Sequence, residues 1–372
     1  MDLSLNMIRH TFREGFRWSV VFGAFWMIGC STNQAHRKAG TSGAVTTKSP
    51  QVRPAVFNAR DVFLRAGASF REKDYETASN LYQKLVEKEP AGRYANVARF
   101  NGALSLERLG RYLEAVPLYE DVAKRTAGSK DAHDALFRGA TCLQAAEKWR
   151  EAMGMWSRIL KPEFPQISVH DRLEAHVGRA WSQEKLGDMA RAEQDYKAVF
   201  SLHRKNLDNR LIRTTPLVAL AHQRVGYLYG SLVESIKIML PVERMARDIE
   251  EKASYFLKAQ SHLLDAIRRH HPKYSLSAGH RLGALYESFY QDLMNSEVPD
   301  DLGAEDNVIY IRELKKKVRP LIEKAVHTYR RTIELGNRLD FNGQWTKMAR
   351  QSLERLERYI AAEAVKESNS KE

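Results

Sequence analysis

Apolar residues recur at a fixed interval through the first half of the chain. Segments 73–82, 110–119 and 147–156 each carry an aromatic residue at the third place, alanine at the sixth and another aromatic residue at the tenth. The segments begin at residues 73, 110 and 147, so the interval is 37 residues. Apolar positions three or four residues apart are typical of an amphipathic helix, and each segment therefore predicts one.

A second helix is predicted upstream of each segment. Small and aromatic residues repeat there at the same interval, as Ala66, Ala103 and Ala140 and as Phe63, Phe100 and Phe137. Paired amphipathic helices with small residues at points of close approach are typical of a solenoid of helical hairpins. Because runs of alternating apolar and polar residues are scarce, we predict an all-α fold.

These repeats resemble the tetratricopeptide (TPR) motif, in which W-x2-L-G-x2-Y is followed by A-x3-F and a closing proline. The A-x3-aromatic half occurs at Ala78/Tyr82, Ala115/Tyr119, Ala152/Trp156, Ala192/Tyr196 and Ala325/Tyr329. The other half is matched at 282–286 and nearly at 225–229. The resemblance covers roughly 57–335 and implies a TPR-like helical-hairpin solenoid.

The spacing of the motif divides this solenoid into two parts. Regular repeats are expected over 57–200 and extended hairpins over 201–340, because the distance from the motif's Tyr to its Ala grows to 30 and then 39 residues. Each helix of these hairpins should gain about three turns. Pro241 and the acidic segment 295–307 are expected where the hairpins reverse, and Pro320 at the start of the last repeat helix.

The final region, 341–372, is expected to close the array. One face of a predicted amphipathic helix over 341–365 carries Trp345, Met348, Leu353, Leu356 and Ile360. A helix with one charged face suits the cap that the end of a solenoid needs, and the residues after it are expected to fray.

Residues 1–29 have the features of a targeting segment. Three arginines precede an apolar run of 11 residues, 19–29, which is shorter than the roughly 20 residues of a membrane span. Met27-Ile28-Gly29-Cys30 then resembles the bacterial lipobox. The resemblance implies a lipoprotein signal peptide over 1–29 and acylation, such as with palmitate, of Cys30. A signal peptide without lipidation and an uncleaved anchor are the alternatives.

Residues 30–56 are rich in Ser, Thr, Gly and Ala, which predicts a flexible linker with a reach of about 28 Å. In the lipoproteins that this N-terminus resembles, Ser after the lipidated Cys accompanies export to the outer membrane. The resemblance therefore implies an array anchored in the outer membrane and facing the periplasm. Cys142 would stay unpaired inside a helix, and a disulfide between Cys30 and Cys142 is the alternative.

The formal net charge of +13 invites a nucleic-acid interpretation, because Lys and Arg displace counterions from phosphates. However, the sequence contains no recognised nucleic-acid-binding module, and the predicted signal peptide over 1–29 also argues against nucleic-acid binding. Catalytic signatures such as G-x-S-x-G, H-E-x-x-H and the P-loop are also missing from the sequence. We therefore expect no enzyme activity, cofactor, metal, nucleic acid or small-molecule substrate. The basic run 315–319 is expected to pair with segment 295–307 or to contact anionic lipid.

In TPR folds the first helix of each pair lines a concave groove. Carried over through the alanine register, the groove positions are Phe63, Phe100, Asn101, Arg108, Phe137, Arg138, Trp181, Arg224 and Arg281. Interleaved aromatic and arginine residues suit an extended peptide or an acidic partner. Asn101 with Arg138 also resembles part of the carboxylate clamp of chaperone-binding TPR domains. The alternative is that Phe63, Phe100 and Phe137 simply stack on one another between repeats.

These features predict a non-catalytic scaffold lipoprotein that binds a protein partner in its concave groove. By resemblance, it would serve a cell-envelope machine for outer-membrane protein assembly, cell-wall synthesis coordination, pilus assembly or gliding motility. The alternative is a regulatory subunit or enzyme of cell-wall metabolism, with a site in the long C-terminal hairpins.

Overall fold

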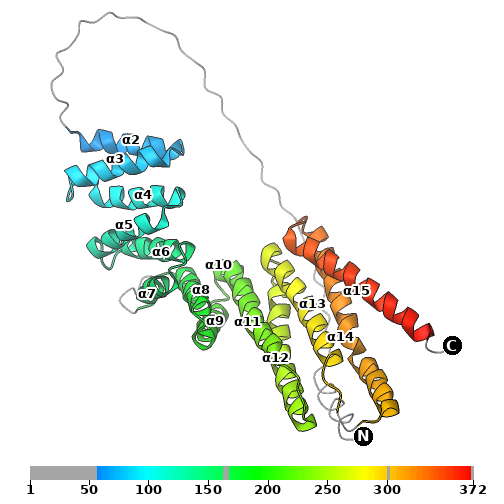
Figure 1. Cartoon of the computed structure of the whole chain (residues 1–372). Helices are drawn as coiled ribbons and strands as arrows, with labels where there is room; N and C mark the ends of the chain where they lie inside the picture. The colour runs from blue at the N-terminus through cyan, green and yellow to red at the C-terminus, as the bar shows by residue number, and fades with distance from the viewer. Residues whose placement is uncertain (1–56, 162–166, 300–301, 370–372) are drawn as a thin grey trace, which may run out of the picture.

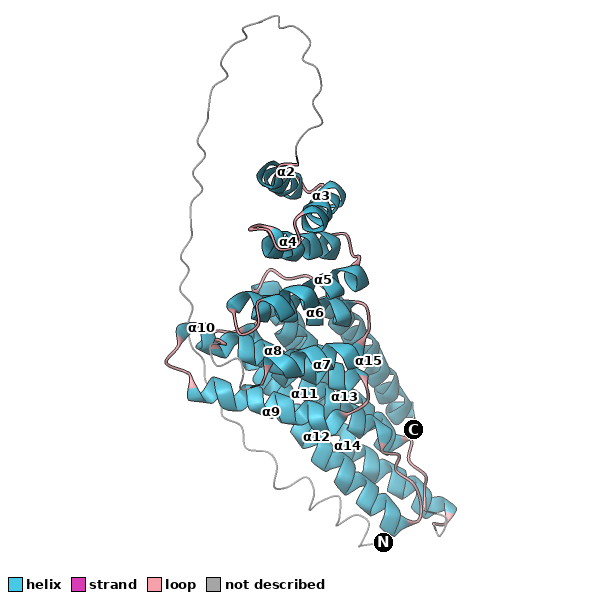
Figure 2. Cartoon of the chain, turned by 90° about the vertical axis from the view of Figure 1, so that its left-hand side faces the viewer, coloured by secondary structure: helices cyan, strands magenta, loops and turns pink. Residues whose placement is uncertain are grey.

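The computed structural model describes residues 57–161, 167–299 and 302–369, and within these ranges every regular element is an α-helix. Figure 2 accordingly shows helices joined by short loops, and no strand, among the described residues. The predicted signal peptide, Cys30 and linker all lie outside the described residues.

Short helical hairpins build the first half. They pair α2 (Ala59–Arg71) with α3 (Tyr75–Lys88), α4 (Ala95–Arg108) with α5 (Tyr112–Arg125), α6 (Lys130–Ala145) with α7 (Trp149–Ile159), and α8 (Val169–Lys185) with α9 (Met189–Lys205). Figure 1 shows them stacked in chain order. The predicted all-α, TPR-like solenoid is confirmed.

Longer hairpins build the second half. After the short α10 (Arg210–Arg213), they pair α11 (Pro216–Ser235) with α12 (Val242–Arg268), and α13 (Pro272–Met294) with α14 (Ala304–Arg338). The last helix, α15 (Gln344–Asn369), packs on α13 and α14. The long hairpins project to the same side in Figure 1. The predictions of elongated hairpins and of a capping helix are therefore confirmed.

The prolines of the long hairpins divide into two cases. Pro241 directly precedes α12, so this hairpin reverses where the sequence predicted. Pro320 was expected to start a helix, and this prediction is wrong because Pro320 lies inside α14. Proline removes one backbone N–H and disfavours the helix interior. Val318 and Leu321 on either side of it are buried in the core shared with α13, and this packing keeps α14 continuous.

Small residues stand where the helices approach most closely. All six repeat alanines, Ala66, Ala78, Ala103, Ala115, Ala140 and Ala152, are 0% exposed. Gly178 of α8 lies so near α7 that a Cβ added there would be 2.4 Å from Trp156. The 37-residue interval thus reports the packing of consecutive helices.

The turns inside the short hairpins share one backbone conformation. Lys73, Gly110, Glu147 and Gly187 hold the same place after the first helix, with φ of 66°, 75°, 58° and 81°. A left-handed conformation is unfavourable for residues with a Cβ by about 1 kcal/mol or more. Lys73 and Glu147 adopt it nevertheless, so the packing of the paired helices dictates this turn even where the sequence lacks glycine.

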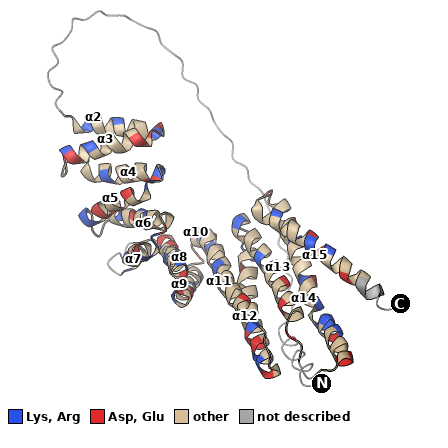
Figure 3. Cartoon of the chain, viewed as in Figure 1, with Lys and Arg blue, Asp and Glu red and all other residues tan. Residues whose placement is uncertain are grey.

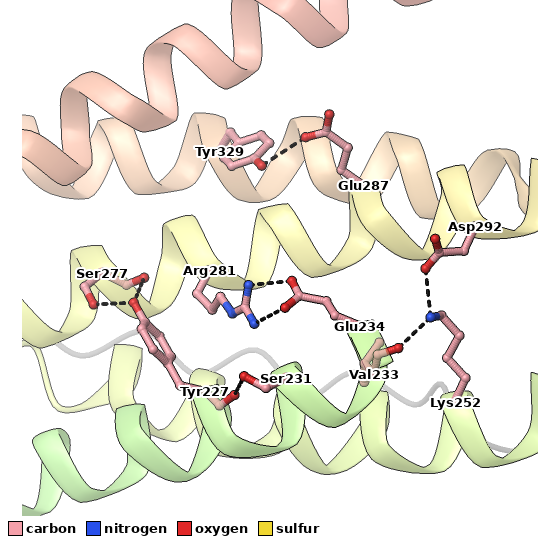
Figure 4. Close-up of polar contacts among 10 residues, drawn as sticks. All are labelled: Tyr227, Ser231, Val233, Glu234, Lys252, Ser277, Arg281, Glu287, Asp292 and Tyr329. Atoms are coloured by element: carbon pink, nitrogen blue, oxygen red, sulfur yellow. Dashed lines mark hydrogen bonds and ion pairs between the residues drawn. The ribbon is translucent and has the colours of Figure 1, made fainter. Parts of the chain in front are cut away.

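A buried lysine joins three helices of the long hairpins (Figure 4). Lys252 of α12 is 0% exposed, and its Nζ donates to the carbonyl oxygens of Val233 at 2.5 Å and Ile236 at 2.9 Å. Its ion pair with Asp292 of α13 measures 2.8 Å. The last carbonyl groups of a helix have no hydrogen-bond donor within that helix. The ammonium group of Lys252 donates to two such carbonyls at the end of α11.

Candidate functional site

A glutamate connects neighbouring repeats by accepting from both a tyrosine and an arginine. The Tyr119 hydroxyl donates to Glu107 Oε2 at 2.8 Å, and Arg138 Nη1 donates to Glu107 Oε1 at 3.1 Å. Glu107, Tyr119 and Arg138 belong to α4, α5 and α6, so one carboxylate links three consecutive helices. Burial and the neighbouring Glu107 raise the pKa of Tyr119, which keeps the phenol protonated as a donor.

The arrangement recurs at two later junctions. The members of these further Tyr–Glu–Arg triads are Tyr196, Glu184 and Arg224, on α9, α8 and α11, and Tyr329, Glu287 and Arg355, on α14, α13 and α15. Burial also raises the pKa values of Tyr196 and Tyr329. Charge-assisted hydrogen bonds are stronger than neutral ones, so the triads hold successive repeats in register.

The predicted groove arginines are therefore engaged inside the molecule. Arg138 and Arg224 belong to triads, and Arg281 binds both carboxylate oxygens of Glu234, at 2.6 and 2.9 Å (Figure 4). Asn101 donates to the Tyr82 hydroxyl at 3.4 Å, at the place that Arg138 takes in the next repeat. An acidic partner would have to displace these internal glutamates before it could reach the arginines.

Each predicted phenylalanine packs on an aromatic residue of its own hairpin, and Phe63 also stacks on Tyr94 at the start of α4, with centroids 4.9 Å apart. Phe63, Phe100 and Phe137 meet the aromatic residue of the following helix, Tyr82, Tyr119 or Trp156, edge to face with centroids 5.9, 5.5 and 4.8 Å apart. Each ring therefore fixes the angle between the two helices of a hairpin. They do not stack on one another, although Phe100 and Phe137 also border a pocket.

The remaining predicted residues lie apart from that pocket. Trp181 is 39% exposed, and its ring packs against Trp149 with centroids 5.5 Å apart. Arg108 is exposed at the end of α4. Neither residue belongs to the pocket lining, so only part of the predicted groove set is brought together.

A pocket of about 510 Å³ opens on the face formed by the first helices α4, α6 and α8. Its lining residues, which define the first-helix pocket, are Phe100, Glu107, His133, Asp134, Phe137, Arg138, Thr141, Asp171 and Glu174. The sequence placed Phe100, Phe137 and Arg138 on this surface. It missed the acidic members, whose only signal was their place on successive first helices.

The electrostatics of the first-helix pocket are acidic. Arg138 is occupied by Glu107, which leaves Asp134, Asp171 and Glu174 without a neutralising Lys or Arg in the lining. Glu174 forms no hydrogen bond or ion pair with any of the residues that the structure describes. Burial raises the pKa of Glu174, while the nearby His170 lowers it and Asp171 raises it. A cationic group seated here would relieve that repulsion.

Histidines gather where α9, α11 and α12 meet. Nδ1 of His222 lies 3.1 Å from Nδ1 of His262, and Phe200 stacks on both rings. Burial lowers the pKa of His222 to about 4 and lowers that of His262. Both rings are therefore neutral near pH 7 and pack as aromatic groups. Among the described residues, no group of three or more His, Cys, Asp or Glu side chains is placed to hold a metal ion.

Among the described residues, side chains of the basic run of α14 form ion pairs with glutamates of α14 and α15. Lys315 forms an ion pair with Glu363 of α15, and Lys316 and Arg319 pair with glutamates of their own helix. Lys and Arg thus gather on the lower part of α14, as Figure 3 shows.

Comparison with known proteins assigns the repeat type. A tetratricopeptide repeat model matches residues 61–91, which span the first hairpin, and no curated protein matches the sequence. The chain therefore contains a tetratricopeptide repeat, and its helices form a TPR-like solenoid. None of the helices in the described ranges combines the length and apolar character needed to cross a membrane.

Several solved structures are similar at low identity. A tetratricopeptide repeat protein from Parabacteroides merdae is 16% identical, with 78% of this chain and 98% of that chain covered and a TM-score of 0.38. The TPR-like repeats of a Podospora anserina protein are 15% identical, covering 54% and 96%, with a TM-score of 0.39. A Rap protein complexed with competence and sporulation factor is 12% identical, covering 82% and 76%, with a TM-score of 0.33. At identities and TM-scores this low, the functions of these proteins cannot be assigned to this chain.

Proposed function

We propose that this protein is a non-catalytic adaptor whose first-helix pocket binds an extended segment of a partner protein through a Lys or Arg side chain. The observation that carries the proposal is the set of carboxylates on one face of the solenoid, Asp134, Asp171 and Glu174, which, among the described residues, have only the histidines His133 and His170 as basic partners. Opposite charges across an interface raise the association rate and fix the register of the partner.

The chemistry of the pocket favours a cationic side chain on an apolar stem. Phe100 and Phe137 border the acidic groups, so the methylene chain of Lys or Arg can pack on the rings while its head reaches the carboxylates. This partner is opposite in charge to the acidic one expected from the sequence. The difference arises because Arg138 and Arg224 already neutralise glutamates of their own chain.

A crosslinking experiment tests the pocket. A photoreactive residue at Thr141 will trap the partner in cells, and combining it with Asp134→Asn, Asp171→Asn and Glu174→Gln will lower the yield at least about tenfold. The reason is that one charge-assisted hydrogen bond contributes roughly 1.5–3 kcal/mol. The measurement is the amount of crosslinked product and the trapped peptide, identified by mass spectrometry.

The control is Glu151→Gln on α7, which removes one exposed carboxylate from a second helix and should leave the yield unchanged. Circular dichroism will report equal helicity for all variants. Undiminished crosslinking in the triple variant, or a trapped segment without Lys or Arg near the contact, would contradict the proposal.

We further propose that lipid on Cys30 anchors the adaptor in the outer membrane, with the linker holding the array in the periplasm. The support is the lipobox-like sequence at the end of a short apolar run. The process served would then be one of the cell envelope, such as outer-membrane protein assembly, cell-wall synthesis, pilus assembly or gliding.

Metabolic labelling tests the anchor. Labelled palmitate will enter the natural chain, and Cys30→Ala will abolish the label and release the chain from the membrane fraction. Cys142→Ala is the matched control, because this thiol is 1% exposed and its pKa is raised by burial to about 12, so it is unreactive. Label that persists in Cys30→Ala would refute lipidation at this residue.

A further inference from the structure

A second pocket, of about 480 Å³, lies between α14 and α15. Its lining carries four cations, Arg312, Lys315, Lys316 and Arg319, against the carboxylate of Glu363. Lys315 pairs with Glu363, while Lys316 and Arg319 pair with exposed glutamates of α14. Exposed pairs of this kind contribute little, so an external anion can replace them. The pocket therefore presents an excess of positive charge to solvent.

Apolar groups accompany these cations. The lining of the pocket also includes Ile322, Ile360 and Tyr359, which is 42% exposed. Val308 precedes Arg312 by one helical turn on the same face of α14 and is 57% exposed, and Ile311 nearby is 43% exposed. The face that carries the cations thus continues into uncovered aliphatic side chains toward the end of the hairpin.

We propose that the α14–α15 pocket and the adjoining face of α14 bind the surface of an anionic phospholipid bilayer, with a lipid phosphate among Arg312, Lys316 and Arg319. Basic side chains at phosphate level with aliphatic neighbours dipping below them are typical of helices that lie at membrane interfaces. An acidic soluble protein would neutralise the cations but would leave Val308 and Ile311 without a matching apolar surface. The volume of the pocket also suits a small head group and the first atoms of its acyl chains.

This site is independent of the first-helix pocket and of the lipid on Cys30. The proposal is therefore tested on the full chain carrying Cys30→Ser, so that no attached lipid contributes. Binding is measured by flotation with vesicles of phosphatidylcholine alone and of phosphatidylcholine mixed with phosphatidylglycerol. The N-terminal apolar run and the arginines before it are the same in every variant, so the difference between variants on the phosphatidylglycerol vesicles reports the α14 site.

We expect Arg312→Gln with Arg319→Gln to bind the phosphatidylglycerol vesicles about 30-fold more weakly, because each cation near an anionic surface contributes roughly fivefold. The matched control is Arg210→Gln with Arg213→Gln, which removes the same charge from exposed positions of α10. It should bind as the parent does. Val308→Ser, which keeps every charge, should also weaken binding, and a purely electrostatic contact would not respond to it.

Two results would overturn the proposal. One is an equal loss of binding in the α10 and α14 double variants, which would mean that only net charge matters. The other is soluble glycerol phosphate binding as tightly as the vesicles, which would define a small-anion site in place of a bilayer contact. Neither outcome bears on partner capture at Thr141, so this inference and the proposed function can fail separately.

Discussion

Lys252→Met will destabilise the α11–α12 hairpin by about 3 kcal/mol, the range expected when one partner of a buried ion pair is removed. Methionine fills a volume similar to that of lysine, so the loss of stability measures the lost polar contacts more than the creation of a cavity. The Val233 and Ile236 carbonyls at the end of α11 would lose their donor, and Asp292 its cation. Hydrogen exchange at the amides of α11 and α12, together with thermal unfolding, measures the effect.

Lys237→Met provides the control for this change. Lys237 is exposed in the loop that joins α11 to α12, so its replacement should alter stability by less than about 0.5 kcal/mol. Exchange rates in Lys252→Met equal to those of the natural chain would show that the ammonium group does not hold the end of α11.

Glu287→Ala will lower the stability of the C-terminal half by about 3 kcal/mol, because a buried phenol loses its acceptor. Glu287 is 5% exposed and receives the Tyr329 hydroxyl at 3.1 Å and Arg355 Nη1 at 2.6 Å. Glu287→Gln keeps the shape and one acceptor oxygen, so we expect a smaller loss of about 1.5 kcal/mol. Thermal and urea unfolding measure both.

A double-mutant cycle separates the phenol from the rest of the triad. In a Tyr329→Phe background no buried hydroxyl is left unpaired, so Glu287→Ala should cost at least about 1 kcal/mol less than it does alone. Glu357→Gln, at an exposed ion pair with Arg330, is the matched control and should change stability by less than about 0.5 kcal/mol. Strict additivity in the cycle would contradict the shared-acceptor geometry.

The repeat architecture could be predicted because it depends on residues of one type at one interval. Ala78, Ala115 and Ala152 report a contact that every repeat makes, so the sequence alone shows the hairpins. The prediction that Pro320 starts a helix was wrong because it considered only the preference of proline for the first turn of a helix. The burial of Val318 and Leu321 on both sides of Pro320 keeps α14 unbroken.

The charge of the candidate site could not be predicted in the same way. Glu107 and Arg138 are 31 residues apart, and Glu184 and Arg224 are 40 apart, so their pairing follows no single interval. Only the superhelix shows that the arginines are already neutralised. Glu174 enters the first-helix pocket from a helix that follows an insertion, where the period of 37 no longer fixes the register.

The junction contacts also limit how freely the hairpins can be exchanged. At one junction, Tyr119 and Arg138 both donate hydrogen bonds to Glu107. At the next junction, Trp156 lies against Gly178, because the indole ring occupies the space that a side chain at residue 178 would need. Excising α6 and α7 as a module would remove Arg138, the cation that pairs with Glu107, and would bring α8 next to Tyr119. The residues at each junction between hairpins fit only the neighbouring hairpin. A hairpin therefore cannot be moved or deleted unless the contact residues on both sides of the new junction are also changed.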